Sequence, residues 1–244
     1  MNRSAGAGRV GIIVVAAGSG SRLGAVLPKA LVPLAGQPIL GHALQGVLAC
    51  PGVTAVVVVA PPGHRSEAEA ACRQGGSEYA ATASGRGSPR TAVPVAVVGG
   101  GAERGDSVAA GLAALPADVD IVLVHDAARC LTPVVVFERV VAAVRGGASA
   151  VVPGLPVVDT IKAVDAAGLV VATPARSTLR AIQTPQGFRR DVLERAHALG
   201  GHATDDATLV ERLGEPVLVI EGDPRAVKVT TAHDLETAAR LLAT

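Results

Sequence analysis

The chain has 244 residues, a length typical of one α/β domain with an appendage. Its formal net charge is +1 and aromatic residues make up 1%, so it has neither the field nor the stacking surfaces that nucleic-acid binders use. No apolar run approaches the roughly 20 residues that span a bilayer, and the N-terminal stretch lacks a signal-peptide cleavage pattern. We therefore predict a cytoplasmic protein with no nucleic-acid partner and no membrane partner.

The composition also indicates how the core is filled. Hydrophobic residues make up 49% of the chain, so Ala, Val, Leu and Ile must form the interior, as in parallel strands that are buried on both faces. The cysteines Cys50, Cys72 and Cys130 are too few and too irregularly spaced for a disulfide framework or a zinc site. We expect them to be structural thiols.

Short Val- and Ile-rich runs alternate with segments of helical pattern along the chain. The predicted strands are residues 10–15, 53–60, 95–98, 121–125, 148–153 and 217–220. The predicted helices are residues 38–49, 67–74, 106–114, 133–144, 190–198, 205–213 and 232–242. This alternation predicts a single α/β domain over residues 1–244, built on a Rossmann-like, mostly parallel sheet with helices on both faces.

Two segments depart from this alternation. Residues 80–94 are rich in Gly, Ser, Thr, Ala and Pro without periodicity, which predicts a flexible surface insertion. Residues 157–173 form two apolar runs around a turn at 165–168, which predicts a protruding β-hairpin arm. Because an isolated hairpin is marginal in water, we expect this arm to pack on a second copy of the chain in a homodimer.

A glycine-rich segment follows the first predicted strand. Residues 14–24 read Val-Val-Ala-Ala-Gly-Ser-Gly-Ser-Arg-Leu-Gly, and Pro-Lys follows at 28–29. Glycines leave backbone amides free to hold phosphate oxygens, and Arg22 and Lys29 add positive charge over the same anion. The glycines alone would suit an ordinary strand-to-helix turn equally well; the two cations favour a triphosphate site.

Two well-known phosphate-binding loops do not fit these residues. A P-loop requires Gly-Lys-Ser or Gly-Lys-Thr at its end, whereas Ala25 follows Gly24 here. A dinucleotide fingerprint requires G-x-G-x-x-G, and the spacing of Gly18, Gly20 and Gly24 is one residue too long.

Two further charged residues lie at informative positions. Asp126 follows a continuous apolar strand, where open α/β sheets place ligand-binding groups. Lys228 lies between valines in a short extended run, so we expect it to point into a polar site, with a protective lysine on an edge strand as the alternative.

These motifs together resemble a known family. Residues 14–29 resemble the nucleotidyltransferases that activate sugars and polyols with nucleoside triphosphates. The resemblance narrows to the 2-C-methyl-D-erythritol 4-phosphate cytidylyltransferase family through residues 99–112, 124–129, 157–162, 184–188 (the turn after the arm), 204–206 and 227–230. It implies transfer of CMP from CTP to 2-C-methyl-D-erythritol 4-phosphate with release of pyrophosphate, in the non-mevalonate pathway to isoprenoid precursors.

The resemblance also implies roles for individual residues. Those implied to bind the nucleotide are Ala16, Ala17, Gly18, Gly20, Gly101, Ser107, Asp126 and Ala127. Those implied to bind the acceptor are Asp126, Arg129, Thr160, Arg176, Thr184 and Lys228, with Thr160 and Arg176 contributed by the partner subunit. Those implied in catalysis are Arg22, Lys29 and Lys228. Mg²⁺ is the implied cofactor near Asp126, and since one carboxylate cannot complete an octahedral site, triphosphate oxygens and water would supply most ligands.

Several of these positions also have a purely structural interpretation. Asp106 or Ser107 can cap the helix predicted from residue 106. Arg129 fits a surface ion pair, Thr160 a strand residue and Arg176 a solvated charge.

Three more residues bear on how closely the chain follows this family. Ala102 stands where relatives often carry an acidic residue, and Cys130 where proline usually follows the arginine. These departures concern nucleotide affinity and leave the reaction unaffected. His125 and Cys130 are expected to pack in the core.

Other functions share parts of this pattern. A cytidylyltransferase for another polyol phosphate, such as ribitol 5-phosphate, would use the same phosphate-binding groups, and a uridylyl- or guanylyltransferase would differ in the base. A catalytically inactive nucleotide-binding regulator is an alternative from another class, although Arg22, Lys29, Asp126 and Lys228 argue against it. An NAD-binding oxidoreductase fits least, since the glycine spacing is wrong.

Overall fold

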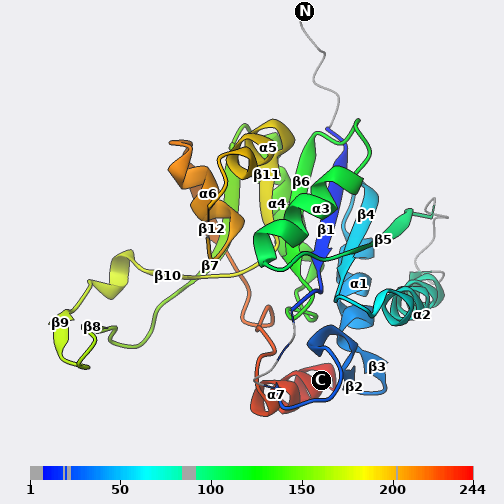
Figure 1. Cartoon of the computed structure of the whole chain (residues 1–244), viewed down its shortest axis with the longest axis horizontal. Coiled ribbons are helices and arrows are strands. Elements are labelled where there is room, and N and C mark those ends of the chain that lie inside the picture. Colours follow the sequence, from blue (N-terminus) through cyan, green and yellow to red (C-terminus); the bar gives the residue numbers. More distant parts are fainter. Residues whose placement is uncertain (1–7, 19, 21–22, 84–91, 202, 244) are drawn as a thin grey trace, which may run out of the picture.

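The computed structural model describes residues 8–18, 20, 23–83, 92–201 and 203–243. The strands of its main sheet are β1 (Val10–Val15), β4 (Val53–Ala60), β5 (Val95–Gly99), β6 (Ile121–Asp126), β7 (Ala150–Pro156), β10 (Arg180–Ile182), β11 (Gln186–Arg189) and β12 (Val217–Glu221). Their order is β10-β7-β11-β6-β1-β4-β5 (Figure 1). Strands β10 and β11 pair with successive parts of one edge of β7, and β12 pairs with its other edge. Pairing is parallel from β5 through β4 and β1 to β6.

Helices cover both faces of this sheet. They are α1 (Ile39–Ala49), α2 (Arg65–Ala83), α3 (Arg104–Ala114), α4 (Val134–Arg145), α5 (Arg190–Ala198), α6 (Asp206–Arg212) and α7 (Ala232–Leu242). Successive residues of β1 point to opposite faces: Ile12 packs in the apolar cluster with α1, α2 and α4, and Ile13 in the cluster with α3, α5 and α6. The predicted α/β sheet, buried on both faces, is confirmed.

The central strand β11 was not predicted as a strand. It runs antiparallel between β6 and β7, where the sequence indicated only the turn after the arm. Its single large apolar residue, Phe188, is completely buried, and Gly187 lies against Val140 of α4 so closely that a Cβ there would collide with it. So short a segment has no periodicity from which to infer a strand.

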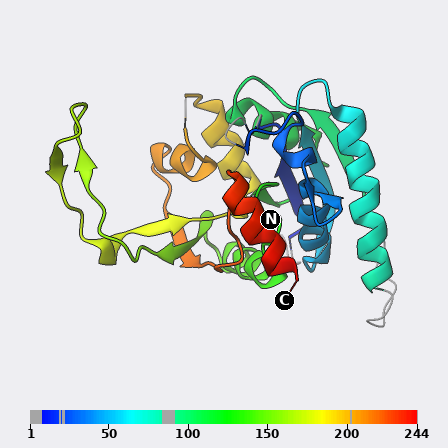
Figure 2. The same ribbon diagram turned by 90° about the horizontal axis from the view of Figure 1, so that it is seen from below.

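The predicted hairpin arm is present. Strands β8 (Ala163–Val164) and β9 (Val170–Ala172) pair antiparallel, and Oδ1 of Asp165 accepts hydrogen bonds from the amides of Ala167 and Leu169 in the turn between them. The arm projects well away from the sheet and its helices (Figure 2). Its apolar side chains are exposed to solvent, for example Val158 at 77% and Leu169 at 66%.

Helix α2 is longer than the sequence predicted. It continues to Ala83, so the first residues of the expected insertion at 80–94 are helical. Residues 84–91, the middle of that insertion, lie outside the described residues. None of the helices among the described residues has the length and apolar character needed to cross a membrane.

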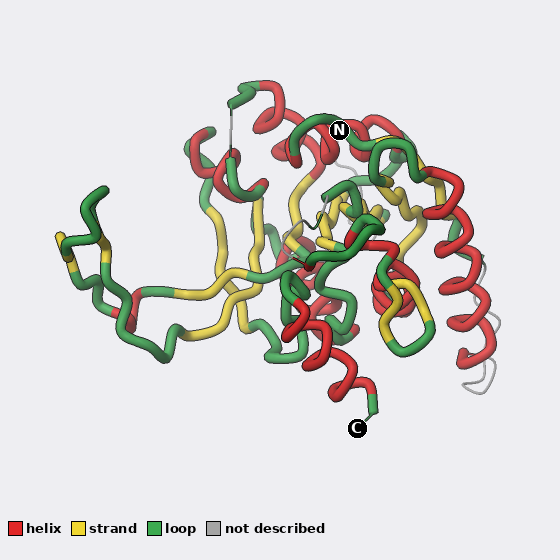
Figure 3. Tube along the Cα trace, turned by 60° about the horizontal axis from the view of Figure 1, so that its bottom comes forward, coloured by secondary structure: helices red, strands yellow, loops and turns green. Residues whose placement is uncertain are grey.

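Short elements lie between β1 and α1. They are the 3-10 helix η2 (Lys29–Leu31) and the two-residue strands β2 (Pro33–Leu34) and β3 (Gln37–Pro38). Figure 3 shows these elements and α7, the helix that leads to the C-terminus, on the same side of the molecule. Lys29 is the first residue of η2, and this places it close to the ends of the central strands.

Candidate active site

A cavity of about 520 Å³ opens at the carboxyl ends of β1 and β6. Its walls come from the loop after β1, from Lys29 in η2, from residues 101–107 at the start of α3, from residues 126–128 after β6, and from Lys228. This is the position at which open parallel sheets bind ligands, because strand ends there leave backbone groups and loop side chains unpaired.

Most residues predicted to bind the nucleotide line this cavity: Ala16, Ala17, Gly18, Gly101, Ser107, Asp126 and Ala127. Gly20 does not line it. Its φ of +68° lies in the left-handed region, and a Cβ on it would collide with the Lys29 side chain. Gly20 thus allows the loop to pass close to Lys29. Arg22, predicted to be catalytic, lies outside the described residues.

Ser107 is buried and joins two backbone groups at the start of α3. Its Oγ accepts a hydrogen bond from the amide of Gly101 (3.2 Å) and donates one to the carbonyl of Glu103 (3.1 Å). The helix begins two residues earlier than predicted: α3 starts at Arg104, with Glu103 as the N-cap residue, while the side chains of Asp106 and Ser107 accept hydrogen bonds from amides near its start, as expected. Asp106 lies in the first turn, where its Oδ2 accepts from the amide of Glu103 (3.1 Å).

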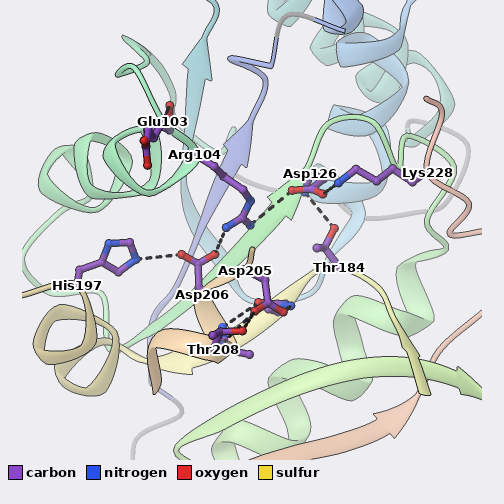
Figure 4. A network of polar contacts seen from close by, with 12 residues as sticks. Glu103, Arg104, Asp126, Thr184, His197, Asp205, Asp206, Thr208 and Lys228 are labelled. Carbon is purple, nitrogen blue, oxygen red and sulfur yellow. Dashed lines mark hydrogen bonds and ion pairs between the residues drawn. The ribbon is translucent and has the colours of Figure 1, made fainter. Parts of the chain in front are cut away.

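Asp126 is held between two cations in the cavity wall (Figure 4). Its Oδ2 lies 2.7 Å from Lys228 Nζ, and its Oδ1 lies 3.5 Å from Arg104 Nη2. Burial of this carboxylate favours its protonated form, but Arg104 and Lys228 outweigh burial and lower the pKa of Asp126 to about 2. Asp126 is therefore ionised throughout the neutral range.

Arg104 was missed by the sequence analysis. It is the first residue of α3 and lines the cavity, and its Nη1 donates to Oδ2 of Asp206 at 2.7 Å. The other oxygen of Asp206 lies 2.9 Å from His197 Nε2. A basic residue three positions after a run of glycines, at the start of a helix, was the available signal.

Thr184 lies behind Asp126 and does not line the cavity. Its Oγ1 accepts a hydrogen bond from the amide of Asp126 (3.0 Å) and lies 3.2 Å from His125 Nδ1. The side chain of Thr184 is buried, so in this structure it fixes the end of β6. His125 is buried against Phe137, with ring centroids 5.0 Å apart, as expected for a packing residue.

Arg129 also lies outside the cavity lining. Its Nη1 donates to the carbonyl of Ala226 (2.7 Å) and its Nη2 to the carbonyl of Ile182 (3.1 Å). The alternative of a surface ion pair is therefore wrong: Arg129 ties the end of β10 to the segment that carries Lys228. Cys130 next to it is buried, as expected.

The two acceptor-binding candidates on the arm are far from their own chain's cavity lining. Thr160 is exposed, and Arg176, in the 3-10 helix η4 (Arg176–Thr178), is exposed and donates from Nη1 to the carbonyl of Val158 (2.7 Å). This bond joins the two sides of the arm at its base. Neither residue lines the cavity of its own chain.

The chain is similar to known proteins over nearly its whole length. The model of the 2-C-methyl-D-erythritol 4-phosphate cytidylyltransferase family matches residues 10–244. The chain belongs to this family. The 2-C-methyl-D-erythritol 4-phosphate cytidylyltransferase of Nocardia farcinica is 50% identical over 242 residues, which is 99% of this chain and 97% of that protein. The relative of the same name from Rhodococcus jostii is 50% identical over 240 residues, 97% of this chain and 96% of its own length.

The fold of this cytidylyltransferase family member is also similar to that of a solved structure. The crystal structure of 2-C-methyl-D-erythritol 4-phosphate cytidylyltransferase from Thermus thermophilus superposes with a TM-score of 0.72 at 31% identity. The match covers 95% of this chain and 98% of that one. The likeness therefore extends over nearly the whole chain.

The donors for a metal ion are few in this member of the cytidylyltransferase family. Among residues 8–18, 20, 23–83, 92–201 and 203–243, no three His, Cys, Asp or Glu side chains cluster as a metal site would require. Asp126 offers an ionised carboxylate at the end of the central strand β6. Such a group suits a hard cation that takes its other ligands from phosphate oxygens and water.

Proposed function

We propose that the chain transfers CMP from CTP to 2-C-methyl-D-erythritol 4-phosphate, giving 4-diphosphocytidyl-2-C-methyl-D-erythritol and pyrophosphate. The observation that carries the proposal is the cavity at the ends of β1 and β6, which is lined by Lys29, Lys228 and Asp126 together with residues of the glycine-rich loop. Membership of the cytidylyltransferase family supports the same reaction. The reaction takes place in the cytoplasm, where CTP is available.

The chemistry requires alignment and charge neutralisation more than a base. The phosphate of the acceptor is already an anion at neutral pH, so it attacks the α-phosphorus of CTP without losing a proton. Arg22 and Lys29 neutralise the triphosphate and the departing pyrophosphate, and Lys228 neutralises the α-phosphate in the transition state. The absence of a Ser-His-Asp arrangement from the proposed residues agrees with this scheme.

Nucleotide binding falls to backbone groups and one hydroxyl. Ala16, Ala17 and Gly18 present their amides to the phosphates from the loop after β1. Gly101 and Ser107 lie together at the start of α3, joined by a 3.2 Å hydrogen bond, and they contact the cytosine base. Ala127 and Asp126 contact the ribose and phosphate region from the end of β6.

Mg²⁺ is the cofactor that this proposal requires. Asp126 would contribute one carboxylate oxygen, while triphosphate oxygens and water would complete the coordination. When bound, the ion would neutralise part of the triphosphate charge and polarise the α-phosphate. The low pKa of Asp126 supports this role, because the carboxylate needs no deprotonation before it meets the ion.

The acceptor site is completed by a second copy of the chain. The exposed Val, Ile and Leu side chains of the arm need an apolar surface, and a homodimer provides one. Thr160 and Arg176 would then reach the partner's cavity and bind the acceptor together with Lys228. Thr184 and Arg129 contribute to acceptor binding by fixing the ends of β6 and β10.

Pyrophosphate release with defined substrates tests the function. With Mg²⁺ and CTP, we expect release only when 2-C-methyl-D-erythritol 4-phosphate is present, and little release with ATP, GTP or UTP. Equal or faster turnover with ribitol 5-phosphate would show that the proposed acceptor is wrong. No release with any acceptor, alongside measurable CTP binding, would support the inactive regulator instead.

A further inference from the structure

Asp206 is a buried carboxylate whose two oxygens are both used by other side chains. Only 1% of its surface is exposed. Its Oδ2 accepts from Arg104 Nη1 at 2.7 Å, and its Oδ1 lies 2.9 Å from His197 Nε2. Figure 4 shows these residues in a line that leads from α5 through α6 to the cavity wall. Because a carboxylate only accepts hydrogen bonds, Nε2 of His197 must carry the proton that it donates.

The start of α6 does not need the Asp206 charge for its capping. The preceding residue, Asp205, is the N-cap: its Oδ1 accepts from the amide of Thr208 at 3.0 Å and from the Thr208 hydroxyl at 2.7 Å. A buried carboxylate without a partner is strongly destabilising. The contact with Arg104 is therefore the main use of the Asp206 side chain, with only a minor gain from the dipole of a short helix.

Arg104 is held more closely on its buried side than on its cavity side. The distance to Asp206 is 2.7 Å, whereas the distance from Nη2 to Asp126 Oδ1 is 3.5 Å. The guanidinium thus has a short, well-formed contact behind the cavity wall and a loose one in front. This arrangement leaves an N–H group in the wall that can turn from Asp126 to an anionic oxygen of a substrate.

We propose that Asp206 and His197 are positioning residues that hold the Arg104 guanidinium in the cavity wall, where it binds an anionic oxygen of the substrates. Asp206 fixes the guanidinium, and His197 fixes the Asp206 carboxylate by occupying its other oxygen. Without Asp206, the remaining ion-pair partner of Arg104 in the described part of the chain is Asp126, and Arg104 moves into the cavity to compete with Lys228 for it. This inference rests on the reaction proposed above.

A double-mutant cycle separates positioning from general stabilisation. We expect Asp206→Asn to lower kcat/KM about tenfold, because it keeps the shape of the side chain but removes the charge that holds Arg104. In an Arg104→Gln background the same change should cost less than about twofold, because the residue it positions is gone. An equal loss in both backgrounds would show that Asp206 only supports the packing of α6, and would overturn the inference.

Asp205→Asn is the matched control for the charge. It removes a carboxylate one residue away whose charge also acts on Arg104, and it keeps a good N-cap residue; the hydrogen bonds of Asp205 go to Thr208 and Gln186. We expect its kcat/KM to stay within about twofold of the wild-type value. A tenfold loss in this variant would mean that the local acidic charge matters and the contact with Arg104 does not.

His197 supplies a second test that lies farther from the cavity. His197→Gln retains an N–H donor that can reach Asp206, so it should keep most activity, whereas His197→Ala should lose about threefold to tenfold in kcat/KM. Equal activities of the two variants would remove His197 from the proposal. All variants are compared by melting temperature as well, since a positioning role changes kcat/KM without a matching loss of stability.

The proposed reaction and the positioning role fail in different ways. If the wild-type chain releases no pyrophosphate with any acceptor, the reaction is wrong, and the cycle is then scored on the Kd for CTP measured by calorimetry. If the wild type is active but the loss caused by Asp206→Asn persists in the Arg104→Gln background, the reaction stands and the positioning role is wrong.

Discussion

The ammonium nitrogen of Lys228 lies 2.7 Å from Oδ2 of Asp126, and this ion pair joins the segment before α7 to the end of β6. A backbone hydrogen bond from the amide of Val229 to the carbonyl of Ala128 (2.9 Å) runs beside it. The main chain therefore holds Lys228 at the cavity independently of the ion pair. The backbone of the lysine keeps its place when its ammonium group turns from Asp126 to a phosphate.

The stability of the protein should depend on the ionisation of Asp126. Its pKa is about 2 in the folded protein, below its ordinary value of 3.8, so the unfolded state binds a proton first as the pH falls. The stabilisation is present above pH 4 and is lost between about pH 4 and pH 2, by roughly 2 kcal/mol. Urea denaturation at several pH values measures it. Asp126→Asn should flatten the dependence in this window, whereas the exposed Asp159→Asn should leave it as steep as in the wild type.

Replacing Lys29 should affect turnover far more than folding. We expect Lys29→Ala to lower kcat by about 100-fold, because a donor that neutralises developing phosphate charge is worth about 3 kcal/mol in the transition state. The melting temperature should barely change, since Lys29 is a partly exposed residue of a short 3-10 helix. Arg73→Ala, an exposed change on α2, serves as the control. Wild-type turnover of Lys29→Ala would exclude this lysine from catalysis.

Mixed dimers should regain activity when the two defects lie in different parts of the shared site. An Arg176→Ala chain combined with a Lys29→Ala chain gives heterodimers in which one of the two sites keeps both groups. We expect partial recovery, measured as pyrophosphate release after subunit exchange has been verified with tagged chains. Mixing Lys29→Ala with Lys228→Ala should give none, because both residues line the cavity of one chain. A fully active monomer in light scattering would contradict the shared site.

Arg129 should prove to be a residue of the fold with an indirect effect on activity. Its guanidinium bonds the carbonyls of Ala226 and Ile182, and the loss of both bonds leaves these groups without their donor. We expect Arg129→Met to lower the free energy of unfolding by about 2–3 kcal/mol in urea denaturation. Arg176→Met on the exposed arm should cost less than about 1 kcal/mol. A variant as stable as the wild type but unable to bind the acceptor would instead favour direct contact with the substrate.

The sequence predicted the long elements of the fold well because their side chains repeat regularly. Val-rich runs such as β1 and β4 are buried on both faces, and their burial is visible as continuous apolar stretches. Strands β10 and β11 were missed because they have three and four residues, with arginines and a glycine among them. Their strand conformation is determined by pairing with β7 and β6, which local sequence does not record.

The same limit applied to the site. Asp126 was predictable because its position at the end of a buried strand is itself a signal. The role of Arg104 was not, since its partner Asp206 comes from a helix distant in sequence that packs on the same face of the sheet. Thr184 was predicted to bind the substrate, but its hydrogen bond to the amide of Asp126 could not be predicted, because the antiparallel insertion of β11 is what brings it behind β6.

The position of Lys228 also determines when the cavity becomes complete during synthesis on the ribosome. The sheet from β5 to β6 and the glycine-rich loop belong to the first part of the chain, but the lysine that pairs with Asp126 follows the last strand, β12. A growing chain therefore has a pocket without this lysine until β12 and the segment that follows it have emerged. The pocket therefore gains Lys228 only after β12 has been made, and ligands that bind the completed pocket stabilise the folded chain over any shorter intermediate.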